Sequence, residues 1–232
     1  MEEGLALRLQ NIRQELTKAS AAWGRPPRII AVSKTVAPDL INPLADMGAW
    51  DLGENRVQEM LAKMPLLHPK FRMHLIGRLQ TNKVKYIINK VCLIHSLDRM
   101  ELAGEIGRQA KKAGRVMDVL LQVNIAGEAQ KGGIPPKEAE SFLRECALLP
   151  GLAVRGLMAI MPLAQDAESL RPLFREMRGL FEELARKEIP GVRMEELSMG
   201  MSQDYLIAAQ EGATMVRIGS ALFGARSPKA TN

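Results

Sequence analysis

Short apolar runs alternate with charged, helix-spaced stretches along most of this chain, and this alternation limits the possible folds more than any other feature. Apolar runs of about five residues bounded by turn residues predict buried strands, and the stretches between them, as at 98–112 and 168–187, predict helices. Repeated strand–helix–strand order predicts βαβ units and a parallel sheet. The predicted strands are residues 28–33, 50–53, 72–76, 91–96, 117–123, 152–161, 194–198 and 214–218.

Eight such units in about 200 residues predict an α/β fold that is a single (β/α)8 TIM barrel, with an extra N-terminal helix that ends near Ala22. The alternative is an open, doubly wound sheet. Against it, no GxGxxG follows the first predicted strand and the chain contains no GxxxxGK[ST]. No linker of low complexity divides the sequence, so we expect one domain over residues 1–232.

Composition argues against several classes of protein. No apolar run approaches the roughly 20 residues that span a membrane, and the first residues do not form a secretory signal, so we expect a cytoplasmic protein without membrane contact. Cys92 and Cys146 lie far apart and outside any CxxC, so we expect buried, reduced thiols and neither disulfides nor a zinc site. The net charge of +6 is spread along a chain with 4% aromatic residues, which argues against nucleic-acid binding and suits a small phosphorylated ligand.

Lys34 ends the first predicted strand, and functional groups of such barrels lie at the carboxyl ends of strands. Side chains alternate along a strand, so Lys34 shares a face with Ile30 and Val32. Loss of hydration among apolar neighbours lowers the pKa of a lysine, and the neutral amine can form a Schiff base with a carbonyl group. The alternative is a strand-end lysine whose side chain bends out to solvent.

Two loops rich in serine and glycine follow the seventh and eighth predicted strands, LSMGMSQD (197–204) and RIGSALFGAR (217–226). These two loops commonly bind phosphate in (β/α)8 barrels. Ser198 and Ser220 supply hydroxyl groups, and Gly219 lets backbone amides approach an anion at the start of a short helix. The alternative is that these residues only build two tight turns.

Arg217 lies on the inward face of the eighth predicted strand. A buried guanidinium stays protonated, so it needs an anion, a ring acceptor, or a buried carboxylate such as Glu195, Glu196 or Asp204. A lysine that forms a Schiff base, placed opposite a phosphate site, suits a phosphorylated aldehyde. Pyridoxal 5′-phosphate (PLP) is the obvious candidate.

Eight segments occur in one order that resembles a known family over nearly the whole chain. They are VSKT (32–35), LGENRVQE (52–59), HLIGRLQTNK (74–83), IHSLDR (94–99), QVNIAGEAQKGG (122–133), GLMAIMP (156–162), LSMGMSQDY (197–205) and MVRIGSALFG (215–224). The set resembles the pyridoxal phosphate homeostasis protein family. This resemblance implies the barrel of the alanine racemase N-terminal domain (PLP fold type III), without the β-domain that racemases add.

The resemblance also assigns cofactor-binding roles to Lys34, Asn55, Ser198, Arg217, Gly219 and Ser220. It implies that Lys34 carries PLP covalently as a Schiff base, that Ser198, Gly219 and Ser220 hold the phosphate, that Arg217 lies against the pyridine nitrogen, and that Asn55 lies near the ring or its hydroxyl. It implies no metal.

Two departures from the family pattern stand out. Ser220 occupies a position where the family often has threonine, and it retains the hydroxyl group. The loop NIAGEAQKGG (124–133) lacks the serine- and aspartate-rich character common in the family before Lys131, so neither this loop nor Lys131 receives a ligand role.

We expect binding of the cofactor rather than amino-acid turnover. An arginine at the ring nitrogen keeps that nitrogen unprotonated and weakens the electron sink that racemisation or transamination requires. Racemases use a tyrosine on the opposite face of the ring; here Tyr86 is mid-helix, and Tyr205 either serves that face or packs over the barrel rim. His74 and His95 are bases, metal ligands or hydrogen-bonded barrel residues, and no third ligand is evident.

Three functions follow from the same lysine and barrel. The expected one is a non-catalytic carrier or regulator in PLP (vitamin B6) homeostasis, a monomer with apo PLP-dependent enzymes as candidate partners. The second is a minimal PLP-dependent amino-acid racemase. The third is a lysine-dependent aldolase that uses no cofactor and whose substrate carries the phosphate.

Overall fold

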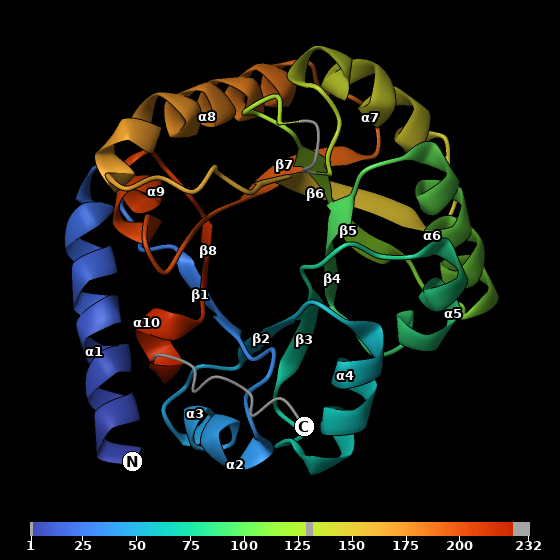
Figure 1. Ribbon diagram of the computed structural model, residues 1–232. Coiled ribbons are helices and arrows are strands. Elements are labelled where there is room, and N and C mark those ends of the chain that lie inside the picture. Colours follow the sequence, from blue (N-terminus) through green and yellow to red (C-terminus); the bar gives the residue numbers. More distant parts are fainter. Residues whose placement is uncertain (1, 129–131, 225–232) are drawn as a thin grey trace.

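A closed barrel of eight parallel strands forms the centre of the computed structural model, which describes residues 2–128 and 132–224 (Figure 1). The strands are β1 (Arg28–Val32), β2 (Asp51–Glu54), β3 (Arg72–Leu75), β4 (Leu93–Leu97), β5 (Met117–Val123), β6 (Leu152–Ala159), β7 (Val192–Met201) and β8 (Met215–Ile218). Each strand pairs with its neighbours in the sequence, and parallel pairing of β1 with β8 closes the barrel, with Ile30 opposite Arg217. The predicted (β/α)8 fold is confirmed, and an open sheet is excluded.

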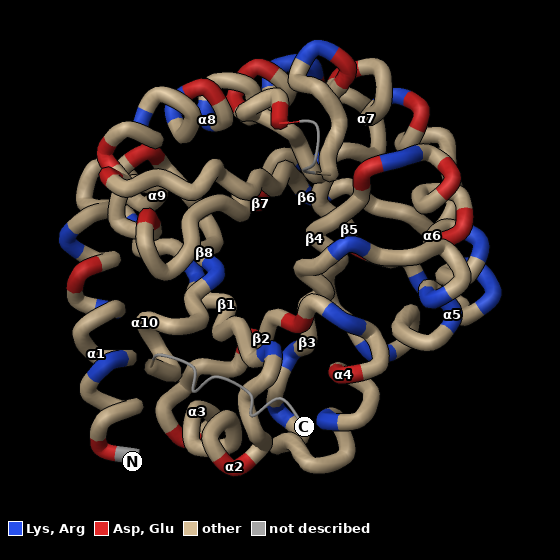
Figure 2. Tube along the Cα trace, in the orientation of Figure 1, with Lys and Arg blue, Asp and Glu red and all other residues tan. Residues whose placement is uncertain are grey.

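Helices surround the barrel and follow the strands in turn (Figure 1). They are α1 (Glu2–Ala19), α2 (Pro38–Ile41), α3 (Pro43–Asp46), α4 (Val57–Lys63), α5 (Val84–Ile87), α6 (Met100–Lys112), α7 (Ala139–Ala147), α8 (Arg171–Arg186), α9 (Tyr205–Gln210) and α10 (Ser220–Phe223). Short 3₁₀ helices are η1 (Ala21–Trp23), η2 (Met64–Leu66), η3 (Thr81–Lys83), η4 (Pro136–Glu138) and η5 (Ala167–Leu170). Lysine and arginine alternate with aspartate and glutamate around this outer ring, so neither sign of charge gathers on one side of it (Figure 2).

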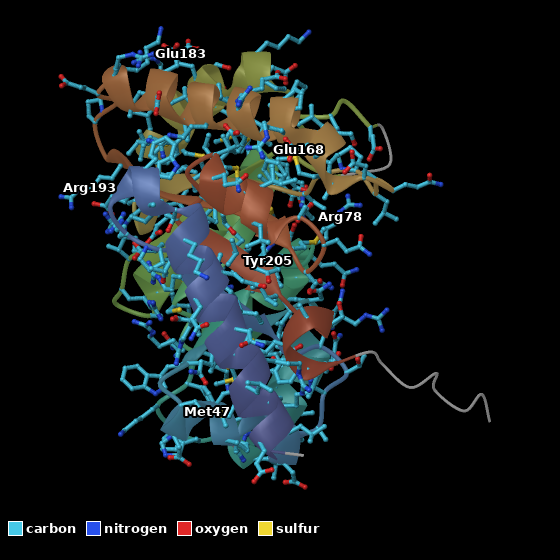
Figure 3. The ribbon with its side chains drawn as sticks, turned by 90° about the vertical axis from the view of Figure 1, so that its left-hand side faces the viewer. Met47, Arg78, Glu168, Glu183, Arg193 and Tyr205 are labelled. Atoms are coloured by element: carbon cyan, nitrogen blue, oxygen red, sulfur yellow. The ribbon has the colours of Figure 1, made fainter. Side chains whose placement is uncertain are left out.

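The extra N-terminal helix is present as α1. Its apolar stripe, Leu5, Leu9, Ile12 and Leu16, is buried, because residues three and four apart share one face of a helix. The helix lies along the barrel beside α9 and α10 (Figures 1 and 3), and Nε of Arg8 donates to the backbone oxygen of Leu222 at 2.6 Å. It ends at Ala19, slightly earlier than predicted, and the turn η1 follows it.

The barrel interior has an apolar and a polar part. The apolar part comprises Ile30, Val32, Ile76, Leu93, Leu120, Met158 and Met215. The polar part comprises the buried side chains of His74, His95, Ser198 and Arg217. Buried polar groups need hydrogen-bond partners, so the polar part must satisfy itself or face a ligand.

Two glycines permit close backbone approaches at the carboxyl end of the barrel. Gly200 has φ of 89°, and a Cβ there would lie 2.4 Å from Cβ of Ala208. A Cβ on Gly77 would lie 2.4 Å from the backbone oxygen of Asn55, so the chain leaving β3 lies directly against the chain leaving β2. The first contact packs α9 against the end of β7, and the second brings together the segments that follow β2 and β3.

Both cysteines are free. Cys146 is buried as expected, whereas Cys92 is half-buried and its Sγ donates to the backbone oxygen of Met73 at 3.3 Å. Burial raises the pKa of Cys92 to about 11 and that of Cys146 to about 12. Neither thiol is therefore activated as a nucleophile.

Two features are absent from the described ranges, 2–128 and 132–224. In this part of the chain, no helix is both long and apolar enough to cross a membrane, and no group of three or more His, Cys, Asp and Glu side chains is placed to hold a metal ion.

Candidate functional site

A cavity of about 400 Å³ opens at the carboxyl ends of the strands, a size typical of small-molecule sites. Its polar lining includes Lys34, Asn55, Ser202, Arg217, Gly219 and Ser220, and its apolar lining includes Ile160, Pro162, Leu163, Ala164, Ala167 and Leu170. Five of the six residues expected at a cofactor site therefore meet in one cavity, and Ser198 does not line it. Figure 3 shows Arg78 and Glu168 at this end of the barrel and Arg193, near the start of β7, at the other.

Ser202, which sequence reasoning missed, joins the loops that follow β7 and β8. Its Oγ accepts hydrogen bonds from the backbone nitrogens of Gly219 at 3.1 Å and Ala221 at 3.2 Å. Gly219 precedes α10, and Ser220 is the first residue of that helix. Hydroxyl and backbone donors thus converge on one wall of the cavity, as a phosphate site requires.

The length of β7 explains why Ser202 was missed. The strand was predicted to end at 198, but it runs to Met201, because its backbone pairs with β8 through Arg217 after an irregularity in register. The serine at the carboxyl end of the strand is therefore Ser202, and Ser198 lies within the strand. A predicted strand that ended at 201 would have placed Ser202 at the mouth of the barrel.

Ser198 is fully buried and supports Arg217. Nη1 of Arg217 donates to the backbone oxygen of Ser198 at 2.9 Å and to its Oγ at 2.8 Å, and Nη2 donates to the backbone oxygen of Ala159 at 2.8 Å. Burial lowers the pKa of Arg217 to about 10, partly opposed by the charge of Asp204, so the guanidinium is charged at neutral pH.

The carboxylates expected as alternatives for Arg217 have other partners. Glu196 forms an ion pair with Arg28, and Oδ1 of Asp204 accepts from the backbone nitrogen of Met201 at 2.5 Å. Two carbonyl groups and one hydroxyl hold Arg217 instead, and its side chain also lines the cavity. This arrangement fits a guanidinium that faces a neutral acceptor on a ligand.

A line of hydrogen bonds leads from Arg217 through the barrel to Asp51. Ser198 Oγ lies 3.0 Å from Nδ1 of His95, Nε2 of His95 lies 3.0 Å from Nδ1 of His74, and Nε2 of His74 lies 2.9 Å from Oδ1 of Asp51. Arginine can only donate and a carboxylate can only accept, so when both rings are neutral each proton along this line points away from Arg217. Both histidines then carry their proton on Nε2.

The pKa values agree with this direction. Burial is the main cause that lowers the pKa of His95 well below its usual 6.5, and the guanidinium groups of Arg217 and Arg28 add to it, so its ring is neutral. Burial acts to raise the pKa of Asp51, but hydrogen bonds from His74 and Arg72 outweigh it and lower that pKa. Neither histidine lines the cavity, which favours their interpretation as hydrogen-bonded barrel residues.

Lys34 follows β1 and lines the cavity together with Asn55, which follows β2. Their position at the strand ends is the one predicted, because all carboxyl ends of a parallel barrel meet at one face. Lys131, which received no expected role, lies outside the described residues.

Neither tyrosine lines the cavity. The hydroxyl of Tyr205 donates to Oε2 of Glu15 on α1, and Figure 3 shows the residue beside that helix. Burial and this carboxylate raise the pKa of Tyr205. Tyr86 lies on α5 and is exposed, with the ammonium group of Lys85 5.0 Å from the centre of its ring. Tyr205 thus packs at the rim, one of its two expected placements.

These groups match the parts of PLP. The amine of Lys34 suits its aldehyde, the donors around Gly219 and Ser220 suit its phosphate, and the buried guanidinium of Arg217 suits a ring nitrogen that accepts a hydrogen bond. The apolar lining between β6 and α8 gives the flat ring a surface to lie against. The residues present therefore fit this cofactor.

Comparisons with known proteins agree with the geometry. The family "Alanine racemase, N-terminal domain" matches residues 7–227. A pyridoxal phosphate homeostasis protein of Aquifex aeolicus is 45% identical over 223 residues, which cover 94% of this chain and 97% of the relative. Another, from Pasteurella multocida, is 37% identical over 232 residues and covers 97% of each chain.

Solved structures show the same barrel. PipY of Synechococcus elongatus, solved with PLP bound, is 36% identical with a TM-score of 0.84, over 95% of this chain and all (100%) of that one. An alanine racemase of Clostridium difficile is 16% identical with a TM-score of 0.73, over 98% of this chain and 58% of that one. The second likeness concerns the fold alone.

Proposed function

Because the chain belongs to the pyridoxal phosphate homeostasis protein family, we propose that it binds PLP and acts in the homeostasis of this cofactor as a carrier or regulator. One observation carries the proposal. Lys34, Arg217 and the Gly219–Ser220 turn come from opposite ends of the sequence and line the same cavity, where they suit the aldehyde, the ring nitrogen and the phosphate of PLP.

Lys34 is the proposed point of covalent attachment. Its neutral amine would form a carbon–nitrogen double bond with the aldehyde carbon of PLP, and the aldehyde oxygen would leave as water with the two amine hydrogens. When bound, PLP would supply a conjugated ring that can withdraw electrons. Val32 and Ile76 line the same cavity as Lys34.

The other residues hold the cofactor without covalent bonds. Gly219, Ser220 and Ser202 would bind the phosphate, and Arg217 would donate to the ring nitrogen and keep it unprotonated, since all four line the cavity. Asn55, which also lines the cavity, would contact a polar substituent of the ring. Ser198, a predicted phosphate ligand, instead accepts hydrogen bonds from Arg217 and holds it in place.

We propose that the protein holds and releases PLP without turning over amino acids. A donor at the ring nitrogen weakens the electron sink, and the hydroxyl of Tyr205 is engaged by Glu15 rather than placed at the cavity. Apo PLP-dependent enzymes as recipients, a monomeric state and a cytoplasmic location remain predictions.

The visible absorption spectrum tests the proposal. Wild type, Lys34→Ala and the control Lys90→Ala, which removes an exposed lysine, are mixed with PLP and recorded before and after borohydride. We expect a yellow band that borohydride fixes covalently in wild type and the control, and no such band in Lys34→Ala. A wild type that stays colourless with added PLP would refute the function. Exchange of the α-proton of alanine in D2O would instead favour the racemase.

A further inference from the structure

The residue after Lys34 has a strained backbone. Thr35 has φ of 62°, in the left-handed region that a β-branched residue rarely adopts. Its backbone nitrogen donates to Oε1 of Glu59, on α4. Strain of this kind persists only where the surroundings enforce it, and it concentrates at functional sites.

The residue before Lys34 is fixed from the same direction. The backbone oxygen of Ser33 accepts from Nζ of Lys63 at 2.6 Å, and Oγ of Ser33 donates to Oε1 of Glu54 at 2.8 Å. Bonds to β2 and α4 therefore hold the turn on both sides of Lys34.

Lys63 joins these bonds into one unit. Besides Ser33, its ammonium group donates to Oε1 of Glu54 at 3.0 Å and to Oε1 of Glu59 at 2.6 Å, so its three N–H groups have three acceptors. The side chains of Glu54, Glu59 and Lys63 are 0%, 25% and 12% exposed. We call these three residues the clamp.

The clamp is costly for the fold. Oε2 of Glu54 is buried and is the one side-chain polar atom of this kind, among the described residues, without a hydrogen-bond partner in the protein. Burial raises the pKa of Glu54, although Lys63 and Ser33 oppose the rise. A buried ion pair such as Glu54–Lys63 contributes little to the stability of a fold. Its hydrogen bonds here reach Ser33, in the turn that carries Lys34.

We propose that Glu54, Glu59 and Lys63 are positioning residues, which hold the Ser33–Thr35 turn in its strained conformation and thereby aim Lys34 into the cavity. The proposal rests on the proposed role of Lys34. Attachment of a carbonyl ligand requires the amine nitrogen to lie close to the carbonyl carbon in the correct orientation. A displacement of the amine by about 1 Å can slow the reaction on the order of 100-fold.

Two substitutions test separately the bonds of the clamp and the backbone strain that these bonds maintain. Lys63→Met removes all three bonds with little change in side-chain length, and Thr35→Gly removes the strain while keeping the backbone N–H, since glycine adopts positive φ freely. We expect Lys63→Met to slow attachment of PLP at least about tenfold. In the Thr35→Gly background the same change should slow it less than about threefold, because the turn no longer needs to be held. Lys112→Met, on the exposed end of α6, is the control for loss of a lysine.

A second readout needs no cofactor. Competitive acetylation of the apo-protein compares the labelling rate of Lys34 with that of the exposed Lys90. We expect Lys63→Met to move the rate of Lys34 toward that of Lys90, as the side chain leaves the cavity. If Lys63→Met fails to fold, Glu59→Met replaces it, because it removes the acceptor of the Thr35 N–H at a side chain that is 25% exposed.

Two results would overturn the proposal: an unchanged labelling ratio, or the same slowing in both backgrounds. Failure of wild type to bind PLP would refute the proposed function alone, because the labelling experiment reports the position of Lys34 independently.

Discussion

Replacement of Ser198 by alanine tests the placement of Arg217. The change removes a hydroxyl that lies 2.8 Å from Nη1 of Arg217 and 3.0 Å from Nδ1 of His95. Nη1 keeps the backbone oxygen of Ser198 at 2.9 Å, so the guanidinium loses only one of two acceptors there. Nδ1 of the fully buried His95 loses its donor.

The cost follows from these bonds. A buried acceptor left without a partner costs about 1–3 kcal/mol, and a hydrogen bond to a charged group contributes about 1.5–3 kcal/mol, part of which Arg217 retains. We expect the free energy of unfolding to fall by about 2–3 kcal/mol, measured by urea denaturation of the apo-protein. The control is Ser141→Ala, whose exposed hydroxyl bonds to the backbone oxygen of Glu138, with an expected loss below about 0.5 kcal/mol.

The same variant decides between two roles for Ser198. If Ser202 binds the phosphate and Ser198 supports Arg217, Ser202→Ala should weaken PLP binding at least about tenfold with little loss of stability, because a charged hydrogen bond of about 1.5–3 kcal/mol is lost. Ser198→Ala should lower stability clearly and weaken PLP binding less than Ser202→Ala does. The reasoning fails if Ser198→Ala leaves stability within about 0.5 kcal/mol of wild type and weakens binding as much as Ser202→Ala does.

Two further predictions concern charge. Burial and nearby positive charges hold the pKa of His95 below its usual 6.5, so below that pH the unfolded chain binds more protons than the folded one. His95 therefore lowers the free energy of unfolding as the pH falls, by up to about 1.4 kcal/mol per pH unit. Urea unfolding between pH 7 and 5 should show a shallower fall for His95→Gln, and equal slopes would contradict the neutral ring. Arg78 is exposed at the end of the barrel where the cavity opens, and Arg193 is exposed at the opposite end. We expect Arg78→Ala to slow the association of PLP about two- to threefold and Arg193→Ala to leave it unchanged, measured by stopped flow at roughly 10 mM ionic strength. Equal effects of the two changes would show that overall charge alone matters.

The barrel could be predicted because its strands carry a pattern that depends on burial alone. Strands buried on both faces read as continuous apolar runs, and β1, β3 and β5 agree closely with the predicted segments. The seventh strand was predicted too short at both ends. It begins at Val192, within a charged stretch, and continues past Gly200 to Met201, because pairing of the backbone and not apolar character sets its length.

That error moved one residue of the candidate site. A strand ending at 198 puts Ser198 at the mouth of the barrel, and a strand ending at Met201 puts Ser202 there. Lys34, Asn55 and the Gly219–Ser220 turn were placed at the mouth correctly, because a residue that directly follows a strand lies there whatever the exact register.

The contacts that support the site residues are harder to predict from the sequence. Carboxylates were the natural candidates for holding Arg217, but backbone oxygens of Ser198 and Ala159 hold it, and carbonyl groups carry no mark in a sequence. Glu59 and Lys63 have the four-residue spacing of an ordinary helix-surface pair, which hides their bonds to the Ser33–Thr35 turn after β1.

The choice between binding and turnover depends on a contact that position could not predict. Tyr205 follows β7 as the site residues follow their strands, so the chain order alone puts it near the mouth. It is also the first residue of α9, which packs against α1, and there its hydroxyl meets Glu15. To serve the cavity, the tyrosine would have to break that bond and leave a position where its side chain is largely buried. The N-terminal helix, outside the barrel and remote in sequence, therefore directs Tyr205 away from the cavity, and this packing supports the proposed binding role over an acid–base role for this tyrosine.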